Sequence, residues 1–394
     1  MLSALLALSI LACPPPGIEH KTAHYDLYAE TVDPEEIGAL LEEAWKQFAR
    51  FFLAAPKDRL RVEIYASNEA YQAALKRDKQ GEIHSGGYYS PGTKIAYLWV
   101  QPSDYFTRQL ILHEAAHQFH YLAATENKNT TAPWYAEGIA EYLGMHNWDG
   151  KTLKTGVVPA VSLEDYPAKA LEQYEAIQED LQAAATGTVA ADRPLAWAIV
   201  HWSVNRRPRE WAAFAADMNR GRPVRKSWEK AMGDMTPAWK KDFRDWLESH
   251  QQPLRIVWIN WQERGELIEG RAAPGVIAGA VLKKPGPRLA VEIVSRDGAN
   301  SAGLMFHHAG KEDYWLLDIL DGSQASIRHR LNGQWESRGA VKFEKRAGAP
   351  TAELVRDGSA SILKVNGTEI GRVEGSGEAG PAFEGGRVVF RLLK

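Results

Sequence analysis

Three histidines and a glutamate stand close together in the stretch HEAAHQFH, residues 113–120, of a chain that has 12 histidines in all. On an α-helix, residues four apart lie one turn apart on the same face, so His113 and His117 would point the same way and could share one metal ion. Glu114 would be turned to the side, where its carboxylate could reach a water on that ion. Two imidazole ligands with an acid between them form the HExxH pattern of zinc sites.

The third ligand decides the interpretation, because HExxH alone also occurs in helices whose histidines are ordinary surface or core residues. His120 is the nearest candidate. A straight helix rises about 1.5 Å per residue, which places His120 about 10 Å along the axis from His113. We therefore expect His120 to be a partly buried neighbour of the ligands and not a ligand itself.

A second acidic motif follows in the stretch WYAEGIAEYLG, residues 134–144. Glu137 comes 20 residues after His117, and Glu141 lies four residues further on the same helical face. An amphipathic helix with exposed acids would give the same pattern. The spacing after HExxH argues against that alternative.

With these two motifs the sequence resembles the gluzincin zinc metallopeptidases, and more closely the peptidase MA-like bacterial domains of unknown function of the DUF1570 type. The resemblance covers about residues 22–250. It consists of a strand-helix-strand opening, a GGYY hairpin, HExxH, EGxAEY and a helix at AWAIVHWSV, residues 196–204. It implies that Glu137 is the third zinc ligand and that Glu141 hydrogen-bonds a zinc histidine, His113 being the first choice.

The reaction that this resemblance implies is peptide-bond hydrolysis with one Zn²⁺ ion. Zinc would lower the pKa of a bound water, and Glu114 would act as general base and then deliver the proton to the leaving amine. A further donor should stabilise the oxyanion. The sequence leaves that donor open among His201, Arg193, Tyr174 and Tyr135, and His201 is taken as a candidate catalytic residue.

A hairpin precedes the zinc helix in the stretch GGYYSPGTKIAYLWV, residues 86–100. Its two aromatic-rich runs flank a Pro-Gly turn. We expect residues 93–100 to form an exposed sheet edge that pairs with an extended substrate. An internal strand is the alternative, because the apolar run IAYLWV fits either position.

The expected fold class is an α+β zincin-like metallopeptidase domain at residues 22–250, followed by an all-β antiparallel sandwich of jelly-roll type at residues 251–394. Helices are predicted at 34–52, about 105–123 and about 134–143 from apolar residues at helical spacing. After residue 250, short alternating runs are separated by Gly, Asp-Gly and Asn-Gly turns, as in antiparallel sandwiches.

The run GLMFHHAGKEDYWLLDI in the second region resembles concanavalin-like jelly rolls of the laminin-G type. That resemblance implies an accessory module that positions substrate or binds a surface carbohydrate or protein. Tyr314, Trp315 and Trp335 could stack on sugars, although core packing is the expected use of at least two of them.

Residues 1–21 are interpreted as a signal peptide and short linker, with a possible lipobox that ends at Cys13, the single cysteine. The run is too short to span a bilayer. We therefore expect export to a bacterial cell envelope, as a possible lipoprotein, or secretion. A net charge of −3 without a basic run argues against a nucleic-acid partner.

Two other functions stay open at this point. The chain could be a zinc-bearing but weakly active surface protein whose main role is binding through the sandwich. It could also be an enzyme of another class, with the sandwich acting on glycans.

Overall fold

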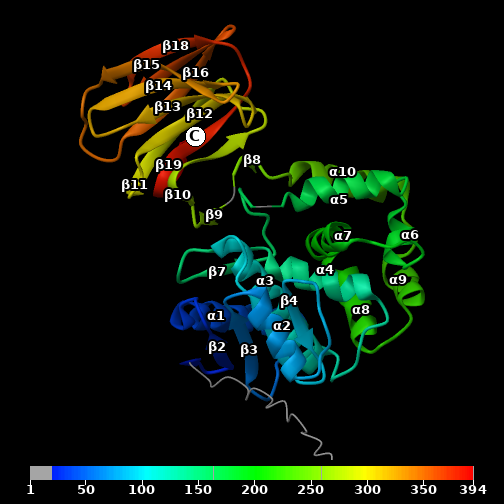
Figure 1. Cartoon of the computed structure of the whole chain (residues 1–394). Helices are drawn as coiled ribbons and strands as arrows, with labels where there is room; N and C mark the ends of the chain where they lie inside the picture. Colours follow the sequence, from blue (N-terminus) through cyan, green and yellow to red (C-terminus); the bar gives the residue numbers. More distant parts are fainter. Residues whose placement is uncertain (1–19, 163, 259, 394) are drawn as a thin grey trace, which may run out of the picture. The chain divides into compact units, whose positions relative to one another are not determined.

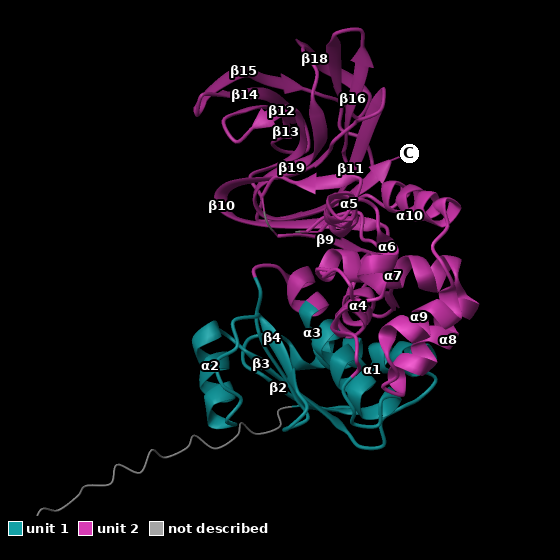
Figure 2. Cartoon of the chain, turned by 90° about the vertical axis from the view of Figure 1, so that its right-hand side faces the viewer, with its two compact units in different colours: residues 1–101, 110–129 teal, residues 102–109, 130–394 magenta. Residues whose placement is uncertain are grey.

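The computed structural model describes residues 20–162, 164–258 and 260–393. The apolar run of the expected signal peptide and Cys13 lie outside these residues. None of the helices in the described part is both long and apolar enough to cross a membrane. The chain divides into two compact units, coloured in Figure 2: unit 1 comprises residues up to 101 and 110–129, and unit 2 comprises residues 102–109 and 130–394.

Unit 1 is built on a five-stranded sheet with the order β1-β2-β3-β5-β4. Its strands are β1 (His20–Lys21), β2 (Tyr25–Ala29), β3 (Leu60–Tyr65), β4 (Gly87–Ser90) and β5 (Ile95–Trp99). The central strands β2, β3 and β5 are parallel, whereas β1 and β4 run antiparallel to their neighbours. The parallel strands are connected through α1 (Pro34–Phe52) and α2 (Asn68–Arg77).

The bounds of α1 agree with the predicted helix at 34–52. Its start is fixed by Asp33, whose side chain accepts a hydrogen bond from the backbone N–H of Glu35, and by Pro34 in the first turn. It ends at Leu53, which has the left-handed conformation of a C-terminal cap.

The expectation that residues 93–100 form the sheet edge is wrong. β5 is an internal strand, paired in parallel with β3 on one side and antiparallel with β4 on the other. Burial of Ala96, Tyr97 and Leu98 fits this central position. The edge strand at this end of the sheet is β4, the first arm of the predicted hairpin.

The HEAAHQFH stretch lies on α3 (Asp104–Phe119), which continues into a π-helical turn, η1 (His120–Ala124). A helix at about 105–123 is therefore confirmed, while the change of helix type at His120 was not predicted. The division between the two units falls within α3, between residues 109 and 110.

The second segment of unit 2 begins with α4 (Pro133–Gly144), which confirms the predicted helix at 134–143. A short hairpin follows, formed by β6 (His146–Trp148) and β7 (Leu153–Thr155). The remaining helices are α5 (Tyr166–Ala176), α6 (Leu181–Ala185), α7 (Arg193–Arg206), α8 (Pro208–Asn219), α9 (Val224–Met232) and α10 (Pro237–Ser249).

Helices α4 and α7 pack closely at Gly138. A Cβ atom at this position would lie 2.5 Å from the backbone carbonyl oxygen of Ala196, so that only glycine fits between the two helices. The glycine of the EGxAEY motif therefore sets the separation of α4 from α7.

The rest of unit 2 is an antiparallel β-sandwich, drawn in yellow to red in Figure 1, as predicted from the alternating runs. Its strands are β8 (Leu254–Ile256), β9 (Trp261–Arg264), β10 (Leu267–Leu282), β11 (Arg288–Asp297), β12 (Ser301–Gly310), β13 (Asp313–Ile319), β14 (Gln324–Leu331), β15 (Gln334–Lys342), β16 (Thr351–Asp357), β17 (Ala360–Val365), β18 (Thr368–Glu374) and β19 (Glu378–Leu393). They form one sheet of 12 strands that curls around a main apolar core. A smaller cluster that includes Met305 and Tyr314 is separate from this core.

The sandwich is joined to the helical part of unit 2 by hydrogen bonds at β9. The side-chain amide of Asn147 donates to Glu263 Oε1 at 2.7 Å and to the carbonyl of Gly265 at 3.0 Å, and its oxygen accepts from the Gly265 N–H at 2.8 Å. Glu263 also accepts from the backbone N–H of Ala160. Burial raises the pKa of Glu263, and these two hydrogen bonds oppose that shift. The predicted boundary near residue 250 thus separates regions of different secondary structure that remain in contact.

Candidate metal centre

His113 and His117 present their Nε2 atoms to one another across one turn of α3. The two nitrogens are 3.1 Å apart, and the ring planes are inclined by 81°. Two nitrogens at about 2.0–2.1 Å from one tetrahedral zinc ion would stand about 3.3 Å apart. The observed spacing therefore suits a shared ion. His113 is buried, whereas His117 is partly exposed.

Glu137 on α4 completes a group of three potential ligands. The ligand atoms of His113, His117 and Glu137 all lie within 4.8 Å of one another. Two imidazoles and one carboxylate are a donor set that zinc accepts in catalytic sites, where three protein ligands leave one position for water. The donor types of this group fit the ion that the sequence predicts, and zinc binding by these three residues stays a prediction.

Glu114 lies against the edge strand of the unit 1 sheet. A Cβ atom at Gly87 would stand 2.9 Å from both Cγ and Oε1 of Glu114, so the carboxylate occupies the space that a side chain would take. Glu114 itself is buried. Burial raises the pKa of the neighbouring Tyr71, and the negative charge of Glu114 adds to the shift.

Glu141 is buried on α4 and has polar partners within unit 2. The hydroxyl of Tyr166 donates to it, the Gln109 amide lies at 3.5 Å and Arg193 Nη1 at 3.7 Å. The pKa of Tyr166 is raised, first by burial and then by the charge of Glu141. These contacts fix the Glu141 carboxylate on the face predicted for it, and its hydrogen bond to His113 stays a prediction.

Arg193 pairs with both acids of the EGxAEY motif. Its Nε lies 3.2 Å from Glu137 Oε2, and its Nη1 approaches Glu141 Oε1. Arg193 is the first residue of α7, so the α4–α7 packing brings a half-exposed guanidinium to the predicted ligand. The sequence named Arg193 as one possible donor but did not predict its pairing with Glu137.

The other three donor candidates have partners elsewhere. The Tyr135 hydroxyl lies 3.0 Å from the side chain of Asn219, and the Tyr174 hydroxyl lies 3.5 Å from the carbonyl of Lys240. His201 Nδ1 accepts from the Trp246 indole at 3.0 Å, while its other nitrogen donates to a backbone carbonyl. Burial lowers the pKa of His201 to about 3, so its ring is neutral near pH 7. Of the four candidates, Arg193 is the one ion-paired with Glu137.

His120 is held by aromatic packing. Its ring stacks on Phe52 with a centroid distance of 5.0 Å and an interplanar angle of 11°. The side chain is buried at the start of η1. The side chain is thus buried as a core residue, and His120 does not belong to the group of three.

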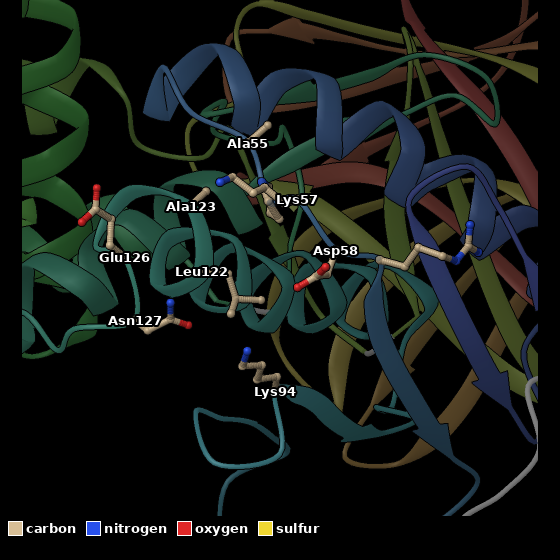
Figure 3. A pocket seen from close by; sticks show the side chains of 10 residues that line it. Ala55, Lys57, Asp58, Lys94, Leu122, Ala123, Glu126 and Asn127 are labelled. Carbon is tan, nitrogen blue, oxygen red and sulfur yellow. The ribbon is translucent and has the colours of Figure 1, made fainter.

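A pocket of about 420 Å³ also lies within unit 1, between the loop after α1 and η1 (Figure 3). Figure 3 shows the side chains of Asp58 and Lys94 extending into it from opposite sides. Glu114, His113 and His117 do not line this pocket. Because none of these three residues lines it, the pocket gives no support to a role in the predicted peptide hydrolysis.

The contact between Gly87 and Glu114 was not predicted. The sequence did carry a signal, since a glycine inside an otherwise aromatic strand often marks a close approach. The approach itself joins residues 27 positions apart, which no local pattern specifies.

Comparisons with known proteins match separate parts of the chain. A family described as "Protein of unknown function (DUF1570)" matches residues 109–225, under a third of the chain, including the metal-ligand candidates and Arg193. No curated protein matches. A carbohydrate-binding module, CBM66 of Bacillus subtilis, aligns at 14% identity over 35% of this chain and 92% of that chain, with a TM-score of 0.30. The GH43 protein BlXynB of Bacillus licheniformis aligns at 12% identity over 34% of each chain, with a TM-score of 0.27.

Metal content should separate the predicted ligands from His120. We expect His113→Ala, His117→Ala and Glu137→Ala each to lose bound zinc, measured by elemental analysis of the purified protein. His120→Phe is the matched control, because a phenyl ring can preserve the stacking on Phe52. Loss of zinc in His120→Phe together with its retention in Glu137→Ala would refute this ligand set. Circular dichroism checks that each variant is folded.

The buried position of His201 should make stability depend on pH. Its pKa is about 3 in the folded protein, against about 6.5 in an unfolded chain. Because the unfolded state binds the proton more tightly, the stabilisation is complete above about pH 6.5 and is lost as the pH falls towards 3. Between these values His201 adds up to about 1.4 kcal/mol per pH unit to the slope of unfolding free energy.

The measurement is urea denaturation from pH 4 to 7. We expect His201→Asn to show a smaller slope than the wild type, by up to one proton, and to be less stable at pH 7 because the neutral ring's contacts are lost. His84→Asn, at an exposed position, is the control. An unchanged slope in His201→Asn would show that this ring does not titrate differently on unfolding.

Proposed function

We propose that the chain is an exported zinc-dependent metallopeptidase, with a zincin-like peptidase region and an accessory sandwich of concanavalin-like type. The observation that carries the proposal is the grouping of His113, His117 and Glu137 within 4.8 Å. Two histidines four residues apart and a glutamate from the next helix are the donors that a catalytic zinc site requires. Export, with Cys13 as a possible lipid attachment point, belongs to the same proposal.

Zinc, when bound, would supply Lewis acidity and lower the pKa of a water towards neutrality. Glu114 acts as general base on that water. Its buried carboxylate, held against β4, is positioned to accept the proton and to pass it to the leaving amine. The hydrogen bond from Tyr166 fixes the Glu141 carboxylate, which would orient a ligand histidine.

Arg193 is the donor that we assign to the developing oxyanion. It is always protonated, it is half exposed and it lies beside the predicted ligand Glu137. A fixed cation next to the reacting carbonyl stabilises the charge that forms in the transition state more than it stabilises the substrate. This role replaces the one considered for His201, whose ring nitrogens are both engaged.

The edge strand β4 supports a peptide as the substrate. It pairs with β5 on one side only within the described sheet, so its other side can add an extended chain by backbone hydrogen bonds. Gly87 on this strand is in contact range of Glu114. A substrate strand added at β4 would therefore run beside the general base.

A surface-binding protein with little peptidase activity is the second candidate. The sandwich would then bind a glycan or a protein, and zinc would have mainly a structural role. The pocket around the half-exposed Trp335 on the sandwich favours a binding role for this region. Both candidates share the zinc ligands and differ in whether Glu114 performs chemistry.

The replacement Glu114→Gln tests the peptidase directly. We expect it to keep one zinc per chain and to lower the rate of peptide hydrolysis by at least about 10²-fold, because the amide cannot accept the proton. Arg193→Ala should also keep zinc and lower kcat by about 10²–10³-fold. The assay is mass spectrometry of a broad peptide library after incubation with each protein.

Two outcomes would count against this function. Wild-type protein that holds stoichiometric zinc but cleaves no peptide of the library would favour the surface-binding candidate. Protein that holds no zinc, and that His113→Ala does not alter, would remove the metallopeptidase altogether.

Gly87→Ala tests the contact between β4 and Glu114. The added methyl group must displace the carboxylate, and a misplacement of about 1 Å in a catalytic group can lower the rate by about 10²-fold. We expect kcat to fall in this range while zinc content stays unchanged. Gly92→Ala is the matched control on the same hairpin, because its Cβ would have only an ordinary contact, 3.7 Å from Ser90 Oγ. Equal activity in the two variants would contradict the proposed role of Gly87.

A further inference from the structure

A pocket of about 320 Å³ opens on the sandwich, lined by side chains from β10, β13, β14, β15 and β19. Its size is at the lower end of the range for small-molecule sites. All of its lining residues belong to unit 2, and none is part of the proposed zinc centre. The pocket is therefore a separate candidate site.

Aromatic rings form one wall of this pocket. Tyr314 is buried at its base, and Trp258 packs against Tyr314 with a centroid distance of 5.8 Å. Trp335 meets Tyr314 edge-on, also at 5.8 Å, and is 39% exposed. An indole with this exposure, fixed on a buried aromatic base, offers a flat apolar surface to a ligand.

Ion pairs form the polar part of the pocket. Arg328 donates to Asp318 at 2.6 Å and to Glu384 at 2.9 Å, and Arg330 lies 3.2 Å from Glu312. Both guanidinium groups stand over the Trp335 ring, at 4.9 and 5.5 Å from its centroid. The pairs restrain the charged side chains, so that donors and acceptors are held in fixed positions around the indole.

The charges of this polar part nearly cancel. Lys311, Arg328 and Arg330 are balanced by Glu312 and Glu384, with Asp318 behind Arg328. An anionic ligand would compete with carboxylates that already bind the arginines. An apolar ligand would bury the charged groups without giving them partners, which is costly.

We propose that this pocket binds a neutral sugar unit of a glycan, with an apolar C–H face of the ring on Trp335 and its hydroxyls on the paired arginines and glutamates. A hydroxyl donates and accepts at once, so it can bridge a guanidinium and a carboxylate that are already paired. The ring buries apolar area on the indole without removing a charge from water.

This inference deepens the binding role proposed above for the sandwich, on which it rests, but it does not depend on zinc or on peptidase activity. Glycan binding and peptide hydrolysis are therefore measured on the same preparations of the full chain. Failure of one leaves the other result interpretable.

The experiment screens the full chain on an array of neutral oligosaccharides, with uronate- and sialate-containing oligosaccharides alongside. The best ligand is then titrated by calorimetry into wild-type protein and variants. We expect Trp335→Ala to weaken binding by at least about 10-fold, through loss of the apolar contact. Glu312→Ala should also weaken it, because Arg330 loses its restraint. Leu331→Ala is the matched control, since Leu331 is 39% exposed on β14 but does not line the pocket.

Glu114→Gln should bind the glycan as the wild type does, and Trp335→Ala should hydrolyse unglycosylated peptides as the wild type does. The proposal is overturned if no neutral oligosaccharide binds at millimolar concentration, if only anionic oligosaccharides bind, or if Trp335→Ala and Glu312→Ala bind like Leu331→Ala. If Trp335→Ala misfolds, glycan binding by Trp335→Phe and Glu312→Ala is compared with that of Leu331→Ala instead. Melting curves show whether each variant is folded.

Discussion

The close approach of α4 and α7 at Gly138 is the constraint on which the geometry of the acidic motif depends. Because no side chain fits between this position and the Ala196 carbonyl, the two helices stand at backbone contact. That contact places Arg193, at the first turn of α7, beside both Glu137 and Glu141. A larger residue at 138 would move all three charged groups relative to one another. The positions of Glu137 and Glu141 relative to Arg193 therefore depend on the glycine of the motif.

Burial gives the two acids of this motif different properties. The Glu141 side chain is 4% exposed and is held by Tyr166, Gln109 and Arg193, which offset the cost of removing a carboxylate from water. The Glu137 side chain is 36% exposed, so it can exchange partners more freely. This difference supports the roles that we propose for them, with Glu141 orienting a histidine and Glu137 binding the metal.

Local patterns in the sequence predicted the helices and the alternating strands well, because periodicity reports which residues face a core. The bounds of α1 agree with its capping residues, and the two motif helices form where predicted. The same periodicity cannot say which strands are neighbours. An apolar run such as IAYLWV is equally suited to an edge and to an interior position, and the structure places it inside the sheet.

The candidate site likewise has features that local patterns predict and features that only the tertiary structure shows. His113, Glu114 and His117 are specified by spacing on one helix, and Glu137 followed from a resemblance in motif order. The contacts Arg193–Glu137 and Gly87–Glu114 join residues 56 and 27 positions apart, and both arise from tertiary packing. The sequence could name Arg193 as a candidate donor but could not predict its ion pair with Glu137, because tertiary packing decides which partners a side chain meets.

The sandwich is attached to the hairpin that follows the acidic helix α4. β6 follows α4 after one residue, and Asn147 on β6 makes three hydrogen bonds to the β9 segment through Glu263 and Gly265. Glu263 is partly buried and its pKa is raised, so losing the Asn147 amide would leave a carboxylate short of partners in a place of low polarity. Separation of the sandwich from the helices at this point is therefore costly. The contact joins the sandwich to the β6–β7 hairpin, which follows the helix bearing Glu137 and Glu141, so the two regions of unit 2 are held together by side-chain hydrogen bonds as well as by the chain.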